Sequence, residues 1–551
     1  MSPKRAGKES RIKTKKMKKY YIFAVILLIA SCFRPQSQAQ TPLTEGGGPV
    51  VEKCFAATST QCLLRNDDKS AIFYLENYST NPKLKFQGLV TYNKSTGTSY
   101  AEEAVLPLGY HHLYTRTLGA EYLGYYYRYN AEKKTFDFSF ARYPQKKSTS
   151  GVREINPENR VAIDVTGRGE ILKYVATSPD DSKYAFVFIV PDENNKAPYF
   201  YCYIYDNTGK ELWYDKFLPT IAGTKFSIQD LELSDKGELL LLVYATKTKG
   251  PNVLHPTMQL FSCTRGNLTS ISEELTFGFV NSMKMLRLAN HDLFIGGYYD
   301  ETMSSNTTGY FNFIVKDDPM RITSKNHAAF DFASGKSYEG LTDHDYYVKC
   351  DYLFEMPDHI IAMLGEQYTS ILQHSEKSAV AYRHVTNDIV CNRFTLDGTS
   401  LGSVRVDKHV SAQAGAIVTT HDDGEPIGSF RLVEKDVRPK APTFYNLGLG
   451  YVPVVQGSEI FVIYTDKASN FEEESNEWES TTIESATDNC VVVTRVDYGT
   501  DKKVVMMPTK AGQTFHDVWL IDGQDIYFGM SGKKAYTIEK FKLNKQWSWD
   551  K

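Results

Sequence analysis

Two short polar clusters in this sequence carry side chains that could perform chemistry. Each places carboxylates beside an imidazole, a combination that can ligate a metal ion or act in general acid and base catalysis. The clusters comprise Asp343, His344 and Asp345, and His421, Asp422 and Asp423. Neighbouring Asp and His residues are also common in solvated turns. We therefore predict turns at both places and treat the six residues as weak candidates for a polar site.

The stretch 466–489, DKASNFEEESNEWESTTIESATDN, is the most acidic in the chain. Its clustered carboxylates could bind calcium or a basic partner, although no Asp-x-Asp-x-Asp-Gly spacing fixes a metal geometry. The other interpretation is a solvated loop that projects from a rigid sheet. Calcium is the one cofactor that the sequence suggests, because no CxxC pair and no Cys/His spacing suits zinc.

The sequence offers little support for a known hydrolase. Gly-x-Ser-x-Gly occurs once, as GTSLG at 398–402, in a turn between two predicted strands and not between a strand and a helix, as a nucleophile elbow requires. The chain has no His-Glu-x-x-His, and the turn LSDKGELL at 233–240 lacks the Thr-Trp of sialidase-type units. The aromatic runs 125–127 and 547–549 could stack on sugars, but Tyr and Trp are also common on sheet surfaces, and we favour packing. The sequence therefore leans against an enzyme.

The N-terminal residues indicate export. Basic residues up to Lys19 precede an apolar run, 20–30, which has the length of a signal peptide core and is too short to span a bilayer. The signal peptide, 1–39, has two candidate ends. Ile29, Ala30 and Ser31 form a lipobox before Cys32, whereas the alternative is cleavage after Ala39. We favour lipidation of Cys32, and we leave open whether translation begins at Met1 or Met17.

The chain has eight cysteines. Cys54 and Cys62 enclose a short loop, and export favours a disulfide between them. Five others lie in apolar, strand-like runs and are expected to be buried free thiols: Cys202, Cys263, Cys350, Cys391 and Cys490.

Composition favours a folded β protein. Of 551 residues, 42% are hydrophobic, and the 37 Tyr and 30 Phe suit pleated, half-buried surfaces. The formal charge of −3 conceals a basic leader, because 53 basic and 65 acidic residues remain outside 1–39. No cluster of basic residues lies in that remainder, so we exclude nucleic acid as a partner.

A repeated unit carries most of the information. Apolar strands flank tight polar turns at Asp180, Asp235, Asn290, Pro357, Gly457 and Asp522, with a weaker copy near Gly119. A third strand follows each hairpin, for example YFYCYIYD from Tyr199, and residues 401–406 form a candidate fourth. Four short antiparallel strands make a propeller blade. We predict an all-β fold, a single β-propeller of about seven blades, with six or eight as alternatives.

A ring of blades must join its two ends. We predict that the strands from Lys83 onwards complete the C-terminal blade. Residues 40–69 would then be a tether or a disulfide-tied lead-in, and 70–551 the propeller. An insertion near 410–445 would pack on one face of the propeller.

Several of these segments are similar to known repeats. SPDDSKYAFVF (178–188) and LSDKGELLLLV (233–243) resemble hairpins of TolB-type and WD40-like propellers. YIYDNTGKELW (203–213), NDIVCNRFTLDGTSLGSV (387–404) and FVIYTDKASN (461–470) resemble a group of uncharacterised exported Bacteroidetes proteins. The resemblance implies a propeller in the envelope or secreted, and it carries no catalytic residues.

We therefore expect a binding or scaffold module for a protein, peptide or glycan of the cell envelope. The chain would reach the membrane only through a lipid anchor. Its location would be the periplasm or the outer membrane as a lipoprotein, or otherwise secreted or soluble in the periplasm. The alternative function is a glycan-active hydrolase or lyase with its site at the central channel.

Overall fold

The computed structural model describes residues 50–51, 59–77, 86–130, 132–165, 169–191, 197–223, 225–249, 252–253, 256–301, 307–317, 319–330, 347–374, 380–408, 410–414, 425–427, 430–434, 450–467, 481–482, 489–496, 503–508, 514–522, 525–531 and 536–542. In these ranges the regular elements are β-strands. No helix among them is long and apolar enough to cross a membrane.

Eight sheets of four or more strands follow one another along the described chain, and we number them in order. Sheet 1 contains β2 (Ser59–Asn66), β3 (Ser70–Asn77), β4 (Phe86–Asn93), β5 (Thr98–Val105) and β9 (Val152–Glu154). Sheet 2 contains β6 (His111–Leu118), β7 (Glu121–Asn130), β8 (Thr135–Pro144) and β10 (Glu158–Asp164). Sheet 3 contains β11 (Gly169–Thr177), β12 (Lys183–Val190), β13 (Tyr199–Asp206), β14 (Glu211–Phe217), β30 (Glu425–Ile427) and β31 (Phe430–Glu434). Sheet 4 contains β15 (Lys225–Leu233), β16 (Leu239–Thr246), β19 (Thr257–Thr264) and β20 (Asn267–Glu274).

The second half of the chain repeats this plan. Sheet 5 contains β21 (Phe279–Arg287), β22 (Leu293–Asp300), β23 (Gly309–Lys316) and β24 (Arg321–Ala329). Sheet 6 contains β25 (Tyr347–Glu355), β26 (Ile361–His374), β27 (Val380–Phe394), β28 (Ser400–Val406), β29 (Val410–Ala414) and β34 (Thr481–Thr482). Sheet 7 contains β32 (Tyr451–Gln456), β33 (Glu459–Lys467), β35 (Asn489–Arg495) and β36 (Lys503–Pro508). Sheet 8 contains β37 (Thr514–Asp522), β38 (Asp525–Ser531), β39 (Tyr536–Lys542) and β1 (Val50–Val51). A short pair, β17 (Thr248–Lys249) and β18 (Asn252–Val253), lies between β16 and β19.

The predicted hairpins are confirmed. The turn at Asp180 joins β11 to β12, the turn at Asp235 joins β15 to β16, and the other five predicted turns likewise join paired strands. Sheet 1 adds a hairpin at Asp67 and Asp68, whose first strand lies in the residues that the sequence assigns to a tether. The described sheets of four or more strands number eight, which is among the counts that the sequence leaves open.

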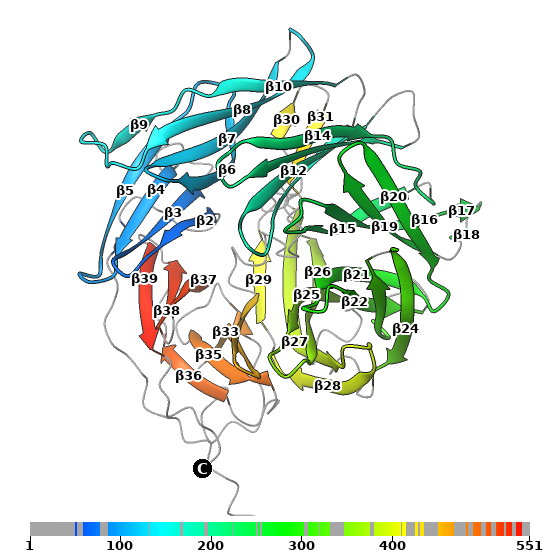
Figure 1. The fold of residues 1–551 in the computed structure, drawn as a ribbon. Coiled ribbons are helices and arrows are strands. Elements are labelled where there is room, and N and C mark those ends of the chain that lie inside the picture. The colour runs from blue at the N-terminus through cyan, green and yellow to red at the C-terminus, as the bar shows by residue number, and fades with distance from the viewer. Residues whose placement is uncertain are drawn as a thin grey trace, which may run out of the picture.

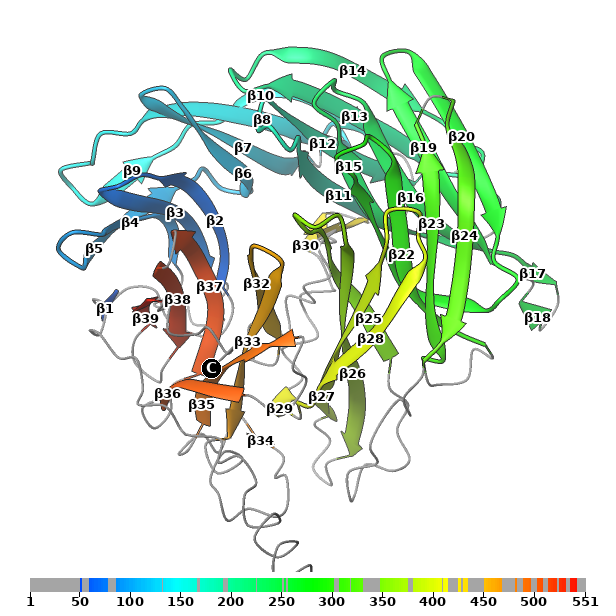
Figure 2. The same cartoon turned by 60° about the horizontal axis from the view of Figure 1, so that its bottom comes forward.

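The sheets stand around a central axis, and the chain passes from sheet to sheet in sequence order (Figure 1). In each sheet the first strand lies nearest the axis, and the last of the four main strands lies outermost (Figure 2). Burial follows this plan, because all of β22 is buried whereas β20 on the outside is largely exposed. Four-stranded antiparallel sheets arranged in this way form a β-propeller.

Hydrophobic cores lie between the faces of neighbouring sheets. Six such cores join the successive pairs from sheet 1 to sheet 7. Between sheets 2 and 3, the rings of Tyr125 and Phe186 have centroids 4.6 Å apart, and both side chains are fully buried. The many Tyr and Phe of the sequence thus hold the sheets against one another.

Two predictions about chain organisation are wrong. The segment from Lys83 does not complete the last sheet, because β4 and β5 pair within sheet 1, and Val50–Val51 pairs with β39 instead. The first sheet begins at Ser59, before residue 70. Within the insertion near 410–445, β31 joins the free edge of β11 and β29 extends sheet 6, and the packing of the whole insertion on one face stays a prediction.

Candidate functional site at the rim and inner strands

The turns between the first and second strands of the sheets form one candidate site, which we call the rim. It comprises residues 67–69, 119–120, 180–182, 235–237, 289–292 and 357–359. Short polar side chains shape these turns by accepting bonds from their own backbone. Asp180 accepts bonds from the Ser178 hydroxyl, at 2.6 Å, and from the Ser182 N–H, at 2.9 Å. Asp67 accepts bonds from two backbone N–H groups in the same way, the first of them that of Lys69.

These donors keep the rim carboxylates charged. The Ser178 hydroxyl, together with other donors, holds the pKa of Asp180 well below its usual range. The Lys69 N–H, followed by that of Ser70, lowers the pKa of Asp67. A hydrogen bond to the ionised form favours that form, so both groups are anionic at neutral pH.

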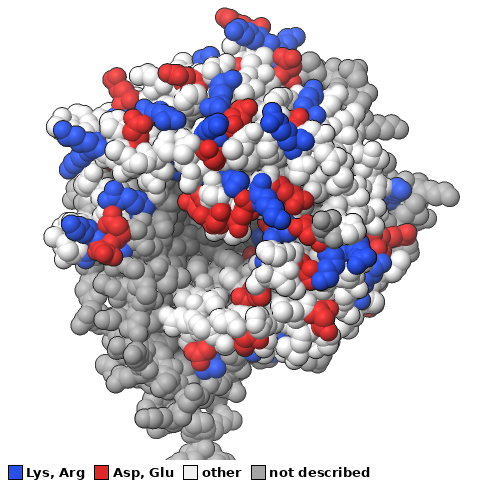
Figure 3. All heavy atoms as spheres, viewed as in Figure 1, with Lys and Arg blue, Asp and Glu red and all other residues white. Residues whose placement is uncertain are grey.

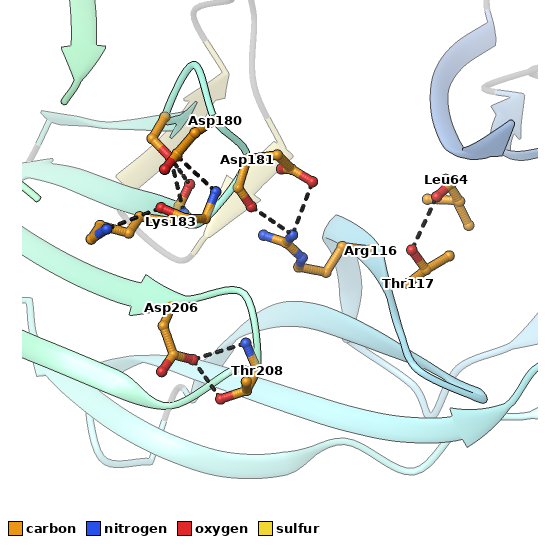
Figure 4. A network of polar contacts seen from close by, with 10 residues as sticks. Leu64, Arg116, Thr117, Asp180, Asp181, Lys183, Asp206 and Thr208 are labelled. Atoms are coloured by element: carbon orange, nitrogen blue, oxygen red, sulfur yellow. Dashed lines mark hydrogen bonds and ion pairs between the residues drawn. The ribbon is translucent and has the colours of Figure 1, made fainter. Parts of the chain in front are cut away.

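Polar contacts tie the first strands and turns of sheets 1 to 3 together (Figure 4). The Thr117 hydroxyl in sheet 2 donates to the Leu64 carbonyl in sheet 1, with 3.3 Å between the oxygens. Arg116 donates from Nη2 to Asp181 Oδ2 in sheet 3, at 3.2 Å, and its guanidinium lies 4.6 Å from the centre of the Tyr184 ring. Each link joins the first strand of one sheet to the first strand or first turn of a neighbouring sheet.

The series of links continues through sheets 4, 5 and 6. Lys183 Nζ and the Asp180 N–H both donate to Asp235 of sheet 4, at 2.5 and 3.1 Å. Arg287 Nε of sheet 5 lies 2.5 Å from Glu232 Oε1 of sheet 4. The Ala289 N–H then donates to a Glu355 carboxylate oxygen of sheet 6, at 2.6 Å. Five successive junctions are thus held by polar contacts at the same end of the first strands.

Charged side chains gather around a central hollow on the face in view in Figure 3, over the β11–β12 and β15–β16 hairpins. The rim residues with exposed carboxylates are Asp68, Asp180, Asp181, Asp235 and Asp358. Of the exposed rim residues, Lys69 and Lys236 are the basic ones. The rim is therefore net acidic and attracts cations and basic chains.

The inner edges of two first strands are covered by side chains of the preceding sheet. In sheet 5, the Met283 and Met285 N–H groups donate to Gln229 and Asp230 of sheet 4, at 3.4 and 2.8 Å. In sheet 6, the Cys350 N–H likewise donates to a sheet 5 hydroxyl. These bonds satisfy backbone groups that a bare strand edge would leave open.

A buried charge network forms the second candidate site, in sheet 6. Lys408 has no solvent-exposed surface, and its ammonium group contacts the Glu366 carboxylate and the Thr386 hydroxyl. The backbone N–H of Lys408 donates to Asp388 Oδ1 at 3.2 Å, and Asp388 Oδ2 lies 3.3 Å from Arg405 Nε. Buried charges persist only where they are paired and hydrogen-bonded, so this cluster fixes the link between β28 and β29.

Asp351 lies in the same sheet, on β25, which pairs with the strand β26 that carries Glu366. It is the extra residue of a bulge in β25, because pairing with β26 shifts between Cys350 and Tyr352. Burial, and then the neighbouring negative charge of Glu366, raise the pKa of Asp351 well above its usual range. Burial also raises the pKa of Glu366, against the opposing effect of Lys408. A carboxyl with a raised pKa can hold a proton at neutral pH and give it up to a base.

The residues predicted from sequence as polar-site candidates fall outside the described part of the chain, so their prediction stays open. They are Asp343, His344, Asp345, His421, Asp422 and Asp423, and Cys32, Cys54 and most of the acidic loop 466–489 also lie outside the described residues. Cys62 lies in β2, but its side chain is not described. Within the described part of the chain, no three His, Cys, Asp or Glu side chains form a group that could hold a metal ion.

Two smaller predictions are confirmed. Four of the five scattered cysteines are buried free thiols: Cys202, Cys263, Cys350 and Cys391. The run 125–127 packs inside the molecule, because all three tyrosines are buried. The side chain of Cys490 and the run 547–549 lie outside the described part.

Comparisons with known proteins found only remote likenesses. No protein family matches its sequence, and no curated protein is a significant match. Many solved structures match it in fold. The propeller domain of the Trilobed protease from Pyrococcus furiosus is 10% identical, with a TM-score of 0.29, and the match covers 64% of this chain and 95% of that chain.

Two further structures belong to the same range of similarity. A protein of unknown function from Dyadobacter fermentans is 9% identical with a TM-score of 0.29, over 68% of this chain and 94% of that one. An ulvan lyase of polysaccharide lyase family PL25 is 9% identical with a TM-score of 0.36, over 91% and 96%. Such remote likeness transfers no function, and the resemblance to exported Bacteroidetes proteins stays a prediction.

Proposed function

We propose that this chain is an exported β-propeller that binds a partner protein of the cell envelope at its rim. The observation that supports this function best is the set of exposed rim carboxylates around a hollow, on sheets that five polar junctions hold in place. Rigidly held loops are where binding residues concentrate. In this proposal the eight sheets are the blades of one ring, and β1 on β39 joins its ends.

The proposed location follows from the leader. In this proposal a lipid on Cys32 anchors the protein to a membrane of the cell envelope, such as the outer membrane. The propeller that follows Cys32 in the chain supplies the binding face. Replacing Cys32 by Ser should abolish palmitate labelling and release the protein from the membrane fraction. Unchanged labelling and fractionation would show instead that the chain is cut after Ala39.

Charge reversal at the rim tests the binding site. Asp68 and Asp358 are exposed and take no part in the five junctions, so Asp68→Lys with Asp358→Lys should leave the fold intact. Affinity purification from the native envelope should recover a partner with the wild type and much less of it with this variant, because the rim loses its attraction for basic groups.

The matched control reverses two carboxylates on outermost strands, Glu158→Lys with Glu274→Lys. Both residues are exposed, and both lie on the strand at the opposite edge of the sheet from its first strand. This control should recover the partner as the wild type does. Equal recovery by the rim variant would remove the rim as the binding site.

A glycan-active hydrolase or lyase is the second candidate, and Asp351 is the observation that favours it. Its raised pKa suits a group that donates a proton to a leaving oxygen. If the chain degrades an envelope polysaccharide, Asp351→Asn should abolish release of reducing ends while the rim variant retains it. A polysaccharide panel left intact by the wild type would exclude this candidate.

The acidic loop 466–489 remains our proposed calcium site. Clustered carboxylates are the ligands that calcium prefers. A calorimetric titration of the exported chain with calcium should show saturable heat that disappears when the loop glutamates are replaced by Gln. A flat titration would remove the site.

A further inference from the structure

The first strand of sheet 3, β11, differs from most of its counterparts. The first strands of six sheets carry register shifts that mark bulges, and β32 of sheet 7 is the other first strand without one. Bulges twist a strand edge away from further pairing. β11 pairs with β12 without any shift from Leu172 to Thr177. It therefore offers a straight inner edge that another strand can join.

That edge is occupied by a segment from far along the chain. Residues 430–434 of β31 pair in parallel with residues 169–173 of β11, and β30 folds back on β31 as a short hairpin. Among the described first strands, β11 is the one with an added strand on its inner edge. The hairpin shows that this edge accepts an extended segment from outside the blade.

The pairing of β11 with β31 places residues of opposite charge at paired positions, and it also pairs apolar residues. Glu170 lies opposite Arg431, and Lys173 lies opposite Glu434. Between them Ile171, which is fully buried, lies opposite Leu432. Opposite charges at paired positions stabilise a sheet and select one register over its neighbours.

Lys173 places a buried cation at this edge. The residue is 96% buried, and its ammonium group lies 4.7 Å from the centre of the Tyr127 ring of sheet 2. A buried cation at the edge favours a strand that brings an acidic residue to the same position.

We propose that the inner edge of β11 is a docking site for an extended segment of a partner protein, with the pattern apolar–Arg–apolar–apolar–Glu, which residues 425–434 occupy in the absence of that partner. Main-chain bonds supply the affinity and the paired charges supply the specificity, as in other strand-addition sites. The proposal rests on the proposed binding function and names the partner chemistry. The hairpin is short, with three pairs between its strands and five to β11, so an incoming segment competes with few bonds.

A synthetic peptide tests the site directly. In one variant a Gly/Ser linker of equal length replaces residues 425–434, and the probe is the peptide EPIGSFRLVE. The control peptide, EPIGSFELVR, exchanges the two charged residues. The linker variant should bind the probe about tenfold more tightly than the control peptide. The intact chain should bind the probe at least about tenfold more weakly than the linker variant.

Hydrogen exchange locates the binding. Probe binding to the linker variant should protect the amides of residues 169–173 and leave those of β20 unchanged. A linker variant with the wild-type thermal transition that binds neither peptide, or both equally, overturns the proposal. If it fails in this way while the envelope partner is still recovered through the rim, the proposed function stands and the β11 site alone falls.

A second pair of variants keeps the hairpin and guards against misfolding of the linker variant. Arg431→Glu should speed hydrogen exchange in residues 169–173, because two acids then face one another. Adding Glu170→Arg should restore the protection. Absence of both effects would show that the register charges do not hold the edge.

Discussion

At the residue scale, His112 is the clearest example of a titratable group set by its surroundings. Its ring stacks on Tyr74, with centroids 3.7 Å apart, and its Nε2 lies 2.8 Å from the Thr115 hydroxyl. Burial, assisted by the positive charge of Lys173, lowers the pKa of His112 to about 3. The imidazole is therefore neutral over the whole physiological range.

This shift predicts a loss of stability in acid. Between pH 6.5 and about 3 the unfolded chain binds a proton at His112 that the folded chain does not bind. The contribution is fully present above pH 6.5 and is lost as the pH falls, at up to about 1.4 kcal/mol per pH unit. His112→Gln should flatten the dependence of the free energy of unfolding on pH in this window. An unchanged slope in urea titrations at several pH values would contradict the assignment.

The buried pair of Glu366 and Lys408 predicts a large loss from a small change. Glu366→Gln leaves the Lys408 ammonium without its anion in a site that has no solvent exposure. Breaking one partner of a buried pair costs about 3 kcal/mol or more. Chemical denaturation should show this loss in the midpoint of the transition.

Asp351→Asn is the matched control, because it removes a carboxyl whose pKa burial raises. The folded chain binds the Asp351 proton more tightly than the unfolded chain, so the wild type gains stability as the pH falls through the raised pKa. The variant should lose this gain and cost much less than Glu366→Gln at neutral pH. Equal losses for the two variants would show that Lys408 is not held by Glu366.

At the element scale, hairpins were accessible from sequence because their causes are local. The turn at Asp180 is specified by Ser178, Asp180 and Ser182 within five residues, and the flanking apolar runs specify the strands. The sequence did not predict β2, because this strand lies in residues next to the leader. It also misassigned the strand that completes sheet 8, because the pairing of Val50–Val51 with β39 joins segments from opposite ends of the chain.

Most of the candidate sites could not be predicted from sequence, because they depend on pairing between segments that are distant in the chain. Glu366 and Asp388 both contact Lys408 only when three strands are registered, and a bulge that no local sequence rule predicts places Asp351 near Glu366. A usable signal was present, since each acid interrupts an apolar strand: YVKCDYLFE, MLGEQYTSI and NDIVCNRF. A charge in a buried strand requires a partner, although sequence does not name it.

A glycine in β26 predicts how closely sheets 5 and 6 approach. A Cβ on Gly365 would lie 2.5 Å from the Lys349 carbonyl oxygen and 2.5 Å from the Tyr298 ring. Gly365→Ala should therefore cost about 3 kcal/mol, because backbone and a buried ring must both move. Gly97→Ala is the control, with a positive φ of 64° and open space around it, and should cost about 1 kcal/mol. Thermal unfolding of both variants compares them, and equal costs would contradict the close packing.

At the scale of the whole molecule, strands from near both ends of the chain pair in one sheet, sheet 8. β1 adds a fourth strand to sheet 8, which otherwise holds only the last three described strands. Deleting residues 40–58 removes β1 and exposes the edge of β39. The melting temperature should fall by at least about 2–4 °C, which corresponds to about 1 kcal/mol in a large domain. An unchanged melting temperature would show that β1 does not hold the ends together.

The central claim is that the rim is the face that meets a partner. Site-specific photo-crosslinking in the native envelope tests it most directly, with the photoreactive residue placed at Asp68 or Asp358 on the rim and at Glu158 or Glu274 on the outermost strands. We predict one crosslinked product from both rim positions and none of it from the outer positions. The same product from the outer positions alone, or none from either rim position, would contradict the claim.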